Sequence, residues 1–180
     1  MRAEKHLLHL FRFCPRCGSG AFAENDSQSK RCESCGFVYY FNPKGAVAGI
    51  VTDDNGRILV CRRAKEPAKG SLDLPGGFMN PAETAEEALV REIREETGLT
   101  VTESQYLFSL PNVYPYSGLD VHTIDLFFVC RVAPDGNLNP QDDVAECRFM
   151  PRDEISPDDF GLSSVRTGIE RFLKMSPNHR

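Results

Sequence analysis

Hydrophobic residues between positions 81 and 97 recur three or four places apart, which is the spacing of one face of an α-helix. Leu89, Val90 and Ile93 form this apolar stripe and are predicted to face the core. A second flank of the same helix is acidic, and it carries Glu92, Glu95 and Glu96. Ala85 and Ala88 lie on that flank one to two turns earlier, where small side chains leave room for a ligand.

The ends of this helix are predicted from capping residues. Asn80 is a good N-cap, Pro81 is favoured at the first helical position, and Glu83 completes a capping box. Gly98 suits the left-handed residue that ends a helix. The helix is therefore predicted to run from Pro81 to Thr97.

The other elements are predicted from apolar runs and turn signals. Residues 46–52 and 57–63 form two strands of a hairpin around an Asn-Gly turn. Further strands are expected at residues 100–106 and 122–131, with the proline- and tyrosine-rich residues 109–118 as the connecting loop. An amphipathic helix over residues 162–175, with a Ser or Thr cap, is expected to cover the sheet.

The composition fits one domain of ordinary size with a small appendage. The chain has 180 residues, 41% of them hydrophobic, and a net charge of −5. No apolar run approaches the roughly 20 residues that cross a bilayer, so no contact with a membrane is expected. The N-terminus lacks the pattern of a secretion signal, and the cytoplasm is the expected location.

Four of the seven cysteines form two CxxCG pairs, which predict a structural zinc site in a zinc ribbon. The ligands are Cys14, Cys17, Cys32 and Cys35. Gly18 and Gly36 are expected to adopt positive φ beyond the second cysteine of each pair. A redox dithiol or an iron site is the less favoured alternative. His6 and His9 are interpreted as packing or surface residues.

The other three cysteines stand apart from one another in the sequence. Cys61, Cys130 and Cys147 lie in apolar, strand-like surroundings, where a free cysteine acts as a small buried hydrophobe. The turn signal at residues 42–45 is the best candidate boundary, so we expect an N-terminal segment with the ribbon at residues 1–41 and a second domain at residues 42–180.

The acidic flank of the central helix is unusual for a solvated surface. Carboxylates near the C-terminal end of a helix face the negative end of its dipole, at a cost of about 0.3–1 kcal/mol each. A bound Mg²⁺ or Mn²⁺ ion would relieve this penalty and the mutual repulsion of the carboxylates. The alternative is an ordinary charged face with pairs such as Glu87 and Arg91.

The stretch from Gly77 to Leu99 matches the Nudix box, GX5EX7REUXEEXGU, at every fixed position. The chain therefore resembles the Nudix hydrolase superfamily. The resemblance implies an α/β/α sandwich with a mixed sheet, and metal-dependent hydrolysis of a nucleoside diphosphate linked to another group.

The resemblance also assigns roles to residues. Glu92, Glu95 and Glu96 would bind the catalytic metal, with Glu95 the first choice as the base that accepts a proton from water. Gly77 would offer its carbonyl oxygen to the metal, and Arg91 would orient the glutamates. Glu83 would be a loop-organising or secondary metal position, and Asp143 or Glu146 is expected to complete the metal shell or act as base.

The substrate is less well defined. A zinc ribbon before a Nudix domain is similar to NADH pyrophosphatases, but this chain lacks their large domain before the ribbon. Residues 109–118, SLPNVYPYSG, match only part of their SQPWPFPxS array. The candidate substrate contacts are Arg62, Arg63, Lys69, Tyr114 and Tyr116.

We therefore expect a pyrophosphohydrolase acting on NADH or NAD, ADP-ribose or a similar molecule. The alternatives are a Nudix-fold nucleotide-binding or regulatory module, and a protein that processes RNA 5′ ends with the ribbon as its contact. Other nucleic-acid binding is not expected from the charge. A homodimer is possible because dimers are common in the superfamily.

Overall fold

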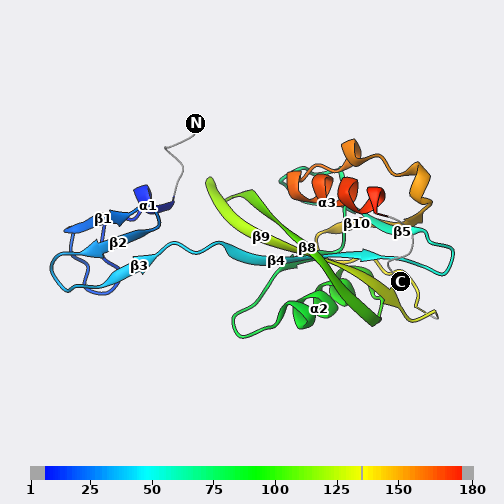
Figure 1. The fold of residues 1–180 in the computed structure, drawn as a ribbon, viewed down its shortest axis with the longest axis horizontal. Helices are drawn as coiled ribbons and strands as arrows, with labels where there is room; N and C mark the ends of the chain where they lie inside the picture. The colour runs from blue at the N-terminus through cyan, green and yellow to red at the C-terminus, as the bar shows by residue number, and fades with distance from the viewer. Residues whose placement is uncertain (1–6, 135, 176–180) are drawn as a thin grey trace. The chain divides into compact units, whose positions relative to one another are not determined.

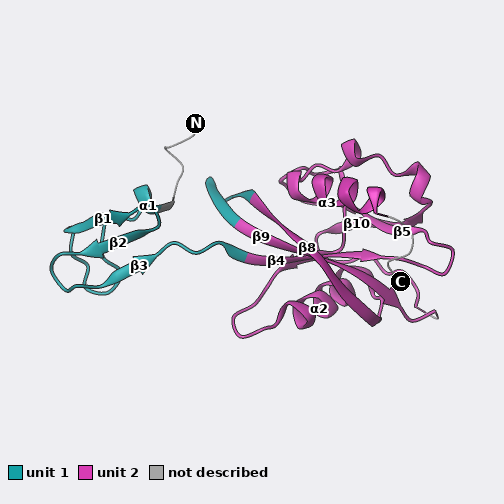
Figure 2. Cartoon of the chain, in the orientation of Figure 1, with its two compact units in different colours: residues 1–44, 113–122 teal, residues 45–112, 123–180 magenta. Residues whose placement is uncertain are grey.

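The structure, a computed structural model, describes residues 7–134 and 136–175. Its described residues fall into two compact units (Figure 2). The first unit consists of the chain up to Lys44 together with Val113–His122, and the second consists of Gly45–Asn112 together with the chain from Thr123 onward. His6, one of the two histidines interpreted above, lies outside the described residues.

The first unit contains a short helix and a three-stranded antiparallel sheet. Helix α1 spans Leu7–Leu10, and the sheet has the order β1 (Phe22–Asp26), β2 (Ser29–Cys32) and β3 (Val38–Tyr40). The antiparallel pairing of β1 with β2 forms a hairpin between the two CxxC pairs. His9 is exposed and pairs with Glu24 at 3.2 Å, which confirms it as a surface residue.

The second unit contains most of two sheets whose strands come from distant parts of the chain; the ends of two strands, within Val113–His122, belong to the first unit. One sheet has the order β7-β4-β9-β8 and the other the order β10-β5-β6. Their bounds are β4 Lys44–Val51, β5 Ile58–Arg63, β6 Leu72–Asp73, β7 Gly76–Phe78, β8 Val101–Tyr116, β9 Leu119–Val132 and β10 Val144–Met150. The strand pairs β4–β7, β5–β6 and β5–β10 are antiparallel, and a parallel bridge joins Leu72 to Phe160.

Helices cover the two faces of these strands. Helix α2 (Ala85–Thr97) lies on one face and helix α3 (Ser163–Lys174) on the other, as Figure 1 shows. Two short 3-10 helices, Arg152–Glu154 and Pro157–Asp159, precede α3. The three layers confirm the predicted α/β/α sandwich, and α3 confirms the predicted C-terminal helix almost to the residue.

Alternation along the strands divides the core between the two helices. In β4, Val47 and Val51 belong to the hydrophobic cluster of α2, whereas Ala48 and Ile50 belong to the cluster of α3. This follows from the period of two in a strand, which points successive side chains to opposite faces. Both faces of the central strands are buried, which explains why their sequences are continuously apolar.

Helix α2 begins four residues later than predicted. Thr84 is the N-cap and forms a full capping box with Glu87, whereas Asn80 precedes the helix in a turn. Glu83 accepts a hydrogen bond from the Asn80 backbone as half of a capping box would, but its other contacts hold it outside the helix. Gly98 ends the helix in the left-handed conformation, as predicted.

The predicted core stripe of α2 is partly wrong. Leu89 and Ile93 are fully buried, but Val90 is 40% exposed. Ala88 is fully buried in the α2 cluster and packs in the core, where it leaves no open space for a ligand. The buried face of α2 is therefore turned toward Ala88 and away from Val90.

Two other expectations about strands were also wrong. The strands before and after the Asn-Gly turn do not form a hairpin, because β4 and β5 enter different sheets and only Thr52 and Ile58 form a bridge. Residues 109–116 are not a loop but continue β8 to Tyr116. Pro111 and Pro115 are tolerated there because β8 is an edge strand, where a missing N–H leaves no partner unpaired.

The cap expected at α3 was wrong as well. Leu162 occupies the N-cap position and makes no side-chain hydrogen bond there. Burial of Val165, Ile169 and Phe172 against the sheet holds the helix in place. None of the helices in the described part of the chain has the length and apolar character that a membrane crossing needs.

Candidate active site and cysteine cluster

A pair of glycines brings the start of the Nudix-box segment close to the strand and helix beside it. A Cβ atom on Gly76 would lie 2.1 Å from the carbonyl oxygen of Val47, so only glycine fits between β7 and β4. A Cβ atom on Gly77 would lie 2.7 Å from the carboxyl carbon of Glu92. The missing side chain of Gly77 therefore makes room for the carboxylate of Glu92 against the backbone of β7.

Arg91 connects three of the acidic residues. Its Nε and Nη2 atoms donate to both carboxylate oxygens of Glu83, at 2.7 and 2.9 Å. Its Nη1 atom donates to Glu92 at 2.7 Å and to Glu95 at 3.1 Å. Nη2 also donates to the carbonyl oxygen of Phe78 at 3.2 Å. The guanidinium thus fixes these carboxylates relative to β7, and Glu87, the alternative partner, caps the helix instead.

The ion pairs of Arg91 shift the pKa values of its partners. Hydrogen bonds from Arg91, and then from the Asn80 backbone, lower the pKa of Glu83 from 4.5 to about 2. The pKa of Arg91 itself is raised, first by its hydrogen bonds with Glu83. Burial raises the pKa of Glu92 because it outweighs the opposing effect of Arg91. Glu83 is thus firmly ionised, whereas ionised Glu92 is penalised.

Glu96 is the most buried of the helix carboxylates, with 8% of its surface exposed. Its Oε2 atom accepts a hydrogen bond of 2.9 Å from the N–H of Gly76. Burial, together with the nearby charges of Asp73, Glu92 and Asp143, raises the pKa of Glu96 from 4.5 to about 9. A buried carboxylate among other acids favours a nearby cation, so the donor set fits a divalent metal.

Asp73 is an acidic residue of this site that the sequence reading did not single out. It is buried on β6 between Leu72 and Leu74, and burial raises its pKa even though Arg63 pairs with it. A charged residue between two buried leucines, just before the glycine pair, was the signal in the sequence. Its charge acts on Glu96, so Asp73 belongs to the same acidic group, the name used below for Asp73, Glu83, Glu92, Glu95 and Glu96.

The structure does not gather Glu92, Glu95 and Glu96 into a closed ligand cluster. Among the residues that the structure describes, the only group of three or more His, Cys, Asp or Glu ligands that approach within 4.8 Å of one another is formed by cysteines. Glu92 and Glu95 instead share Nη1 of Arg91, and Glu96 turns to Gly76. The side chain of Glu95 is 53% exposed.

The two late carboxylates both pair with basic residues. Asp143 lies directly before β10, and Glu146 lies within it. Asp143 forms an ion pair with Lys65, and its charge acts on Glu96. Glu146 is exposed and pairs with Arg62 at 3.5 Å and with Arg148 at 3.4 Å. The structure therefore places Asp143 in electrostatic range of the acidic group.

Two of the predicted substrate contacts are engaged within the chain. Arg63 has a side chain only 10% exposed, and it donates to Asp73 and to the carbonyl oxygen of Pro67. Arg62 donates to the carbonyl oxygen of Gly70 at 2.6 Å. Lys69 is exposed.

The tyrosines of the partial substrate array lie at the end of β8, in the first unit. Tyr116 is 63% exposed, whereas Tyr114 is half-buried. Asn112, which replaces the Trp of the array, is buried and donates to Asp125 while accepting from Ser163. Asn112 thus helps to attach α3 to the sheet.

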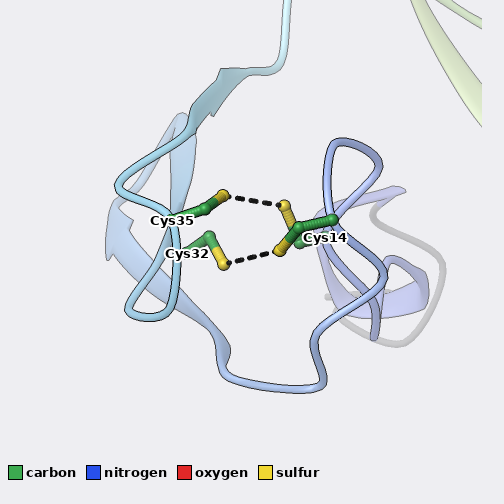
Figure 3. A group of neighbouring side chains, drawn as sticks. Cys14, Cys32 and Cys35 are labelled. Atoms are coloured by element: carbon green, nitrogen blue, oxygen red, sulfur yellow. Dashed lines mark hydrogen bonds between the residues drawn. The ribbon is translucent and has the colours of Figure 1, made fainter.

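The four cysteines of the two CxxC pairs converge in the first unit (Figure 3). The Sγ atoms of Cys14 and Cys35 lie 3.8 Å apart, and those of Cys17 and Cys32 lie 3.6 Å apart. A tetrahedral zinc ion with bonds of about 2.3 Å requires sulfurs about 3.8 Å apart, so the arrangement fits zinc. Gly18 and Gly36 both have φ of 73°, which confirms the predicted positive φ.

Comparison with known proteins agrees with this geometry. The family profile described as the NUDIX domain matches residues 42–168, which include the whole glycine and glutamate segment. The chain belongs to the NUDIX family. Members of this family generally depend on a divalent metal.

Two relatives of this NUDIX chain are named for their activities. An ADP-ribose pyrophosphatase of Methanocaldococcus jannaschii is 42% identical over 113 residues, which are 62% of this chain and 63% of that protein. The NAD-capped RNA hydrolase NudC of Chromobacterium violaceum is 33% identical over 138 residues, which are 77% of this chain and 49% of that protein. The chain thus spans about half to two thirds of the length of these relatives.

A solved structure extends the likeness across both units. The crystal structure of a NUDIX hydrolase from Nitrosomonas europaea superposes with a TM-score of 0.69 at 26% identity, and covers 90% of each chain.

The raised pKa of Glu96 makes a prediction for stability in buffer without added Mg²⁺ or Mn²⁺. The unfolded chain releases this proton near pH 4.5 and the folded chain near pH 9. Between these values the folded state binds more protons than the unfolded state. The contribution of Glu96 to the free energy of unfolding therefore falls by about 1 kcal/mol for each unit by which the pH rises. We expect Glu96→Gln, which keeps an acceptor for Gly76, to remove this part of the pH dependence.

Denaturant unfolding from pH 5 to pH 9 measures the effect. The matched control is Glu86→Gln, because Glu86 is exposed in the first turn of the same helix. Parallel pH curves for Glu96→Gln and the wild type would show that Glu96 ionises normally in the fold.

Proposed function

We propose that this NUDIX chain hydrolyses the diphosphate of a nucleoside diphosphate derivative in a reaction that depends on Mg²⁺ or Mn²⁺. The observation that carries the proposal is the acidic group around α2, in which buried Glu96 and half-buried Glu92 are penalised as anions while Arg91 holds the neighbouring carboxylates in place. The similarity to an ADP-ribose pyrophosphatase supports the substrate class.

Glu92, Glu95 and Glu96 would hold the metal, together with the carbonyl oxygen of Gly77. A divalent ion there supplies charge for the phosphoryl oxygens and lowers the pKa of a bound water. Asp143 is the favoured late carboxylate, since its charge already acts on Glu96. Glu83 is better suited to positioning, because Arg91 occupies both of its oxygens.

Glu95 remains our choice for the general base. It is the exposed member of the three helix carboxylates, so its oxygen can reach an attacking water, and Arg91 holds it at one oxygen only. A base must lie within hydrogen-bond reach of the proton that it accepts. For phosphate binding, Lys69 is favoured over Arg63, whose guanidinium is committed to Asp73 and Pro67.

The ribbon at residues 1–41 is proposed to be a structural zinc module ahead of a catalytic domain at residues 42–180. The metal would have four protein sulfurs as ligands, and a site closed in this way has no open position for catalysis. The small cluster of Cys14, Phe22 and Cys32 is too slight a core to hold this sheet without a metal.

A second candidate function is hydrolysis at RNA 5′ ends. The observation that favours it is the match to the NAD-capped RNA hydrolase NudC, which covers 77% of this chain and so extends beyond the part shared with the pyrophosphatase. In both candidate reactions the same kind of diphosphate bond is cleaved.

A substrate panel with a matched pair of variants tests the proposed reaction. ADP-ribose, NADH, NAD and NAD-capped RNA are each incubated with Mg²⁺ or Mn²⁺, and the products are separated by chromatography. We expect metal-dependent cleavage of at least one diphosphate, a loss of at least about a hundredfold in turnover for Glu96→Gln, and little change for Glu86→Gln. Wild-type turnover in Glu96→Gln would contradict the assignment of the site.

The zinc proposal is tested separately. Elemental analysis of the purified chain should find about one zinc per molecule, and Cys32→Ser should lose the metal and the folded ribbon because the fully buried ligand is removed. Cys130→Ser is the control, since Cys130 lies in the core of the other unit. A folded ribbon without zinc would refute the proposal.

A further inference from the structure

Two cysteines outside the ribbon face each other across paired strands. Cys61 on β5 and Cys147 on β10 are direct partners in the antiparallel register. Their Sγ atoms lie 3.1 Å apart. The interpretation of Cys61 and Cys147 as two separate buried thiols was wrong. Their contact could not be predicted from the sequence, because 85 residues separate them.

The backbone geometry of this pair suits a covalent bond. Residues directly opposite in an antiparallel ladder have Cα atoms about 4.5 or 5.5 Å apart, and both values lie within the range that disulfides span. The two side chains also share a face: Leu59 and Phe149, each two residues away along its strand, pack in the cluster of α2. A sulfur–sulfur bond therefore requires the Sγ atoms to approach by only about 1 Å.

A shared metal ion explains the contact less well. The sulfurs of the ribbon are 3.6 and 3.8 Å apart, close to the edge of a zinc tetrahedron, whereas Cys61 and Cys147 are nearer than that. In the described part of the chain, no third ligand joins them in a cluster of the kind that the ribbon forms.

The two sulfurs differ in access to solvent. Cys61 is fully buried, with 1% of its surface exposed, whereas Cys147 is only half-buried and follows the exposed Glu146. A small oxidant therefore meets Cys147 first, and Cys61 lies behind it. This is the arrangement of a thiol that reacts with the oxidant and a resolving thiol beside it.

We propose that Cys61 and Cys147 are a redox modification site at which a peroxide drives formation of an intramolecular disulfide. The sulfur of Cys147 attacks one peroxide oxygen, the O–O bond breaks, and a sulfenic acid and one water are formed from hydrogen peroxide. The sulfur of Cys61 then attacks the sulfenic sulfur, the S–O bond breaks, and a second water leaves with the Cys61 proton. Two thiols are oxidised by two electrons and one peroxide is reduced to two waters.

The bond would join the strands next to the acidic group. Cys61 is also the register partner of Asp73 on its other side, and its thiol lies in electrostatic range of Glu96. β10 follows directly after Asp143 and carries Glu146, so the disulfide would fix this strand covalently to β5.

Peroxide titration of the full, zinc-loaded chain tests the proposal. The reduced protein is treated with hydrogen peroxide, unreacted thiols are blocked with N-ethylmaleimide, and the digest is read by mass spectrometry. We expect a peptide that links Cys61 to Cys147 before Cys130 is modified. The link should be reversed by dithiothreitol, and Tm should rise by about 10 °C, since the bond closes a long loop.

Single variants separate the steps. In Cys61→Ser, a dimedone adduct should accumulate on Cys147 without a link, whereas in Cys147→Ser the Cys61 thiol should stay reduced. Cys130→Ser is the matched control and should form the link as the wild type does. Zinc content is followed throughout, so that oxidation of the ribbon is recognised.

The proposal is overturned if Cys61 and Cys147 both remain free thiols at peroxide doses that oxidise Cys130 or release zinc. It is equally overturned if the first disulfide joins other cysteines. Neither result bears on hydrolysis, so the redox site and the proposed function fail independently.

Discussion

The contacts of Arg91 are the interaction on which the acidic group depends. Glu92 and Glu95 lie near the end of α2 where the helix dipole is unfavourable to anions, and they lie close to each other. One guanidinium offers five donors in a rigid fork, and here it reaches Glu83, Glu92, Glu95 and the backbone of β7. Lysine could supply the charge at this position but not the geometry. Glu83 lies outside the helix because Arg91 and the Asn80 backbone hold it there.

Close packing of α2 against β4 and β7 also determines where the carboxylates of the site lie. Gly49 lets α2 approach β4, since a Cβ there would lie 2.8 Å from the Cδ1 atom of Ile93. Gly76 and Gly77 do the same for β7, and the N–H of Gly76 thereby reaches Glu96. The carboxylates are thus placed by tight contact between a helix and two strands. This packing buries Glu96 and disfavours its ionised form, as is expected of a carboxylate that binds a cation.

The Nudix-box resemblance implied the layers, whereas sequence reasoning from local spacing predicted the helix that carries the site, its glycine stop and the zinc ribbon. It misplaced the start of α2, since Thr84 and Asn80 are both good caps and tertiary contacts of Glu83 decided between them. It passed over Asp73, although the place of this residue between two buried leucines was a local signal. It missed the Cys61–Cys147 contact, because that contact depends on strands that pair across a long stretch of chain. Strand pairing at such distances leaves no periodic mark in a single sequence.

Diffraction from crystals grown with Mn²⁺ tests whether the carboxylates of α2 bind a divalent cation. Data collected on both sides of the manganese absorption edge locate the ion without any assumption about activity. We expect an anomalous peak within bonding distance of carboxylate oxygens of Glu92 and Glu96, with Glu95 bound to the same ion directly or through a water. A peak elsewhere on the chain, with Glu92 still paired to Arg91 and Glu96 to Gly76 at saturating Mn²⁺, would contradict it.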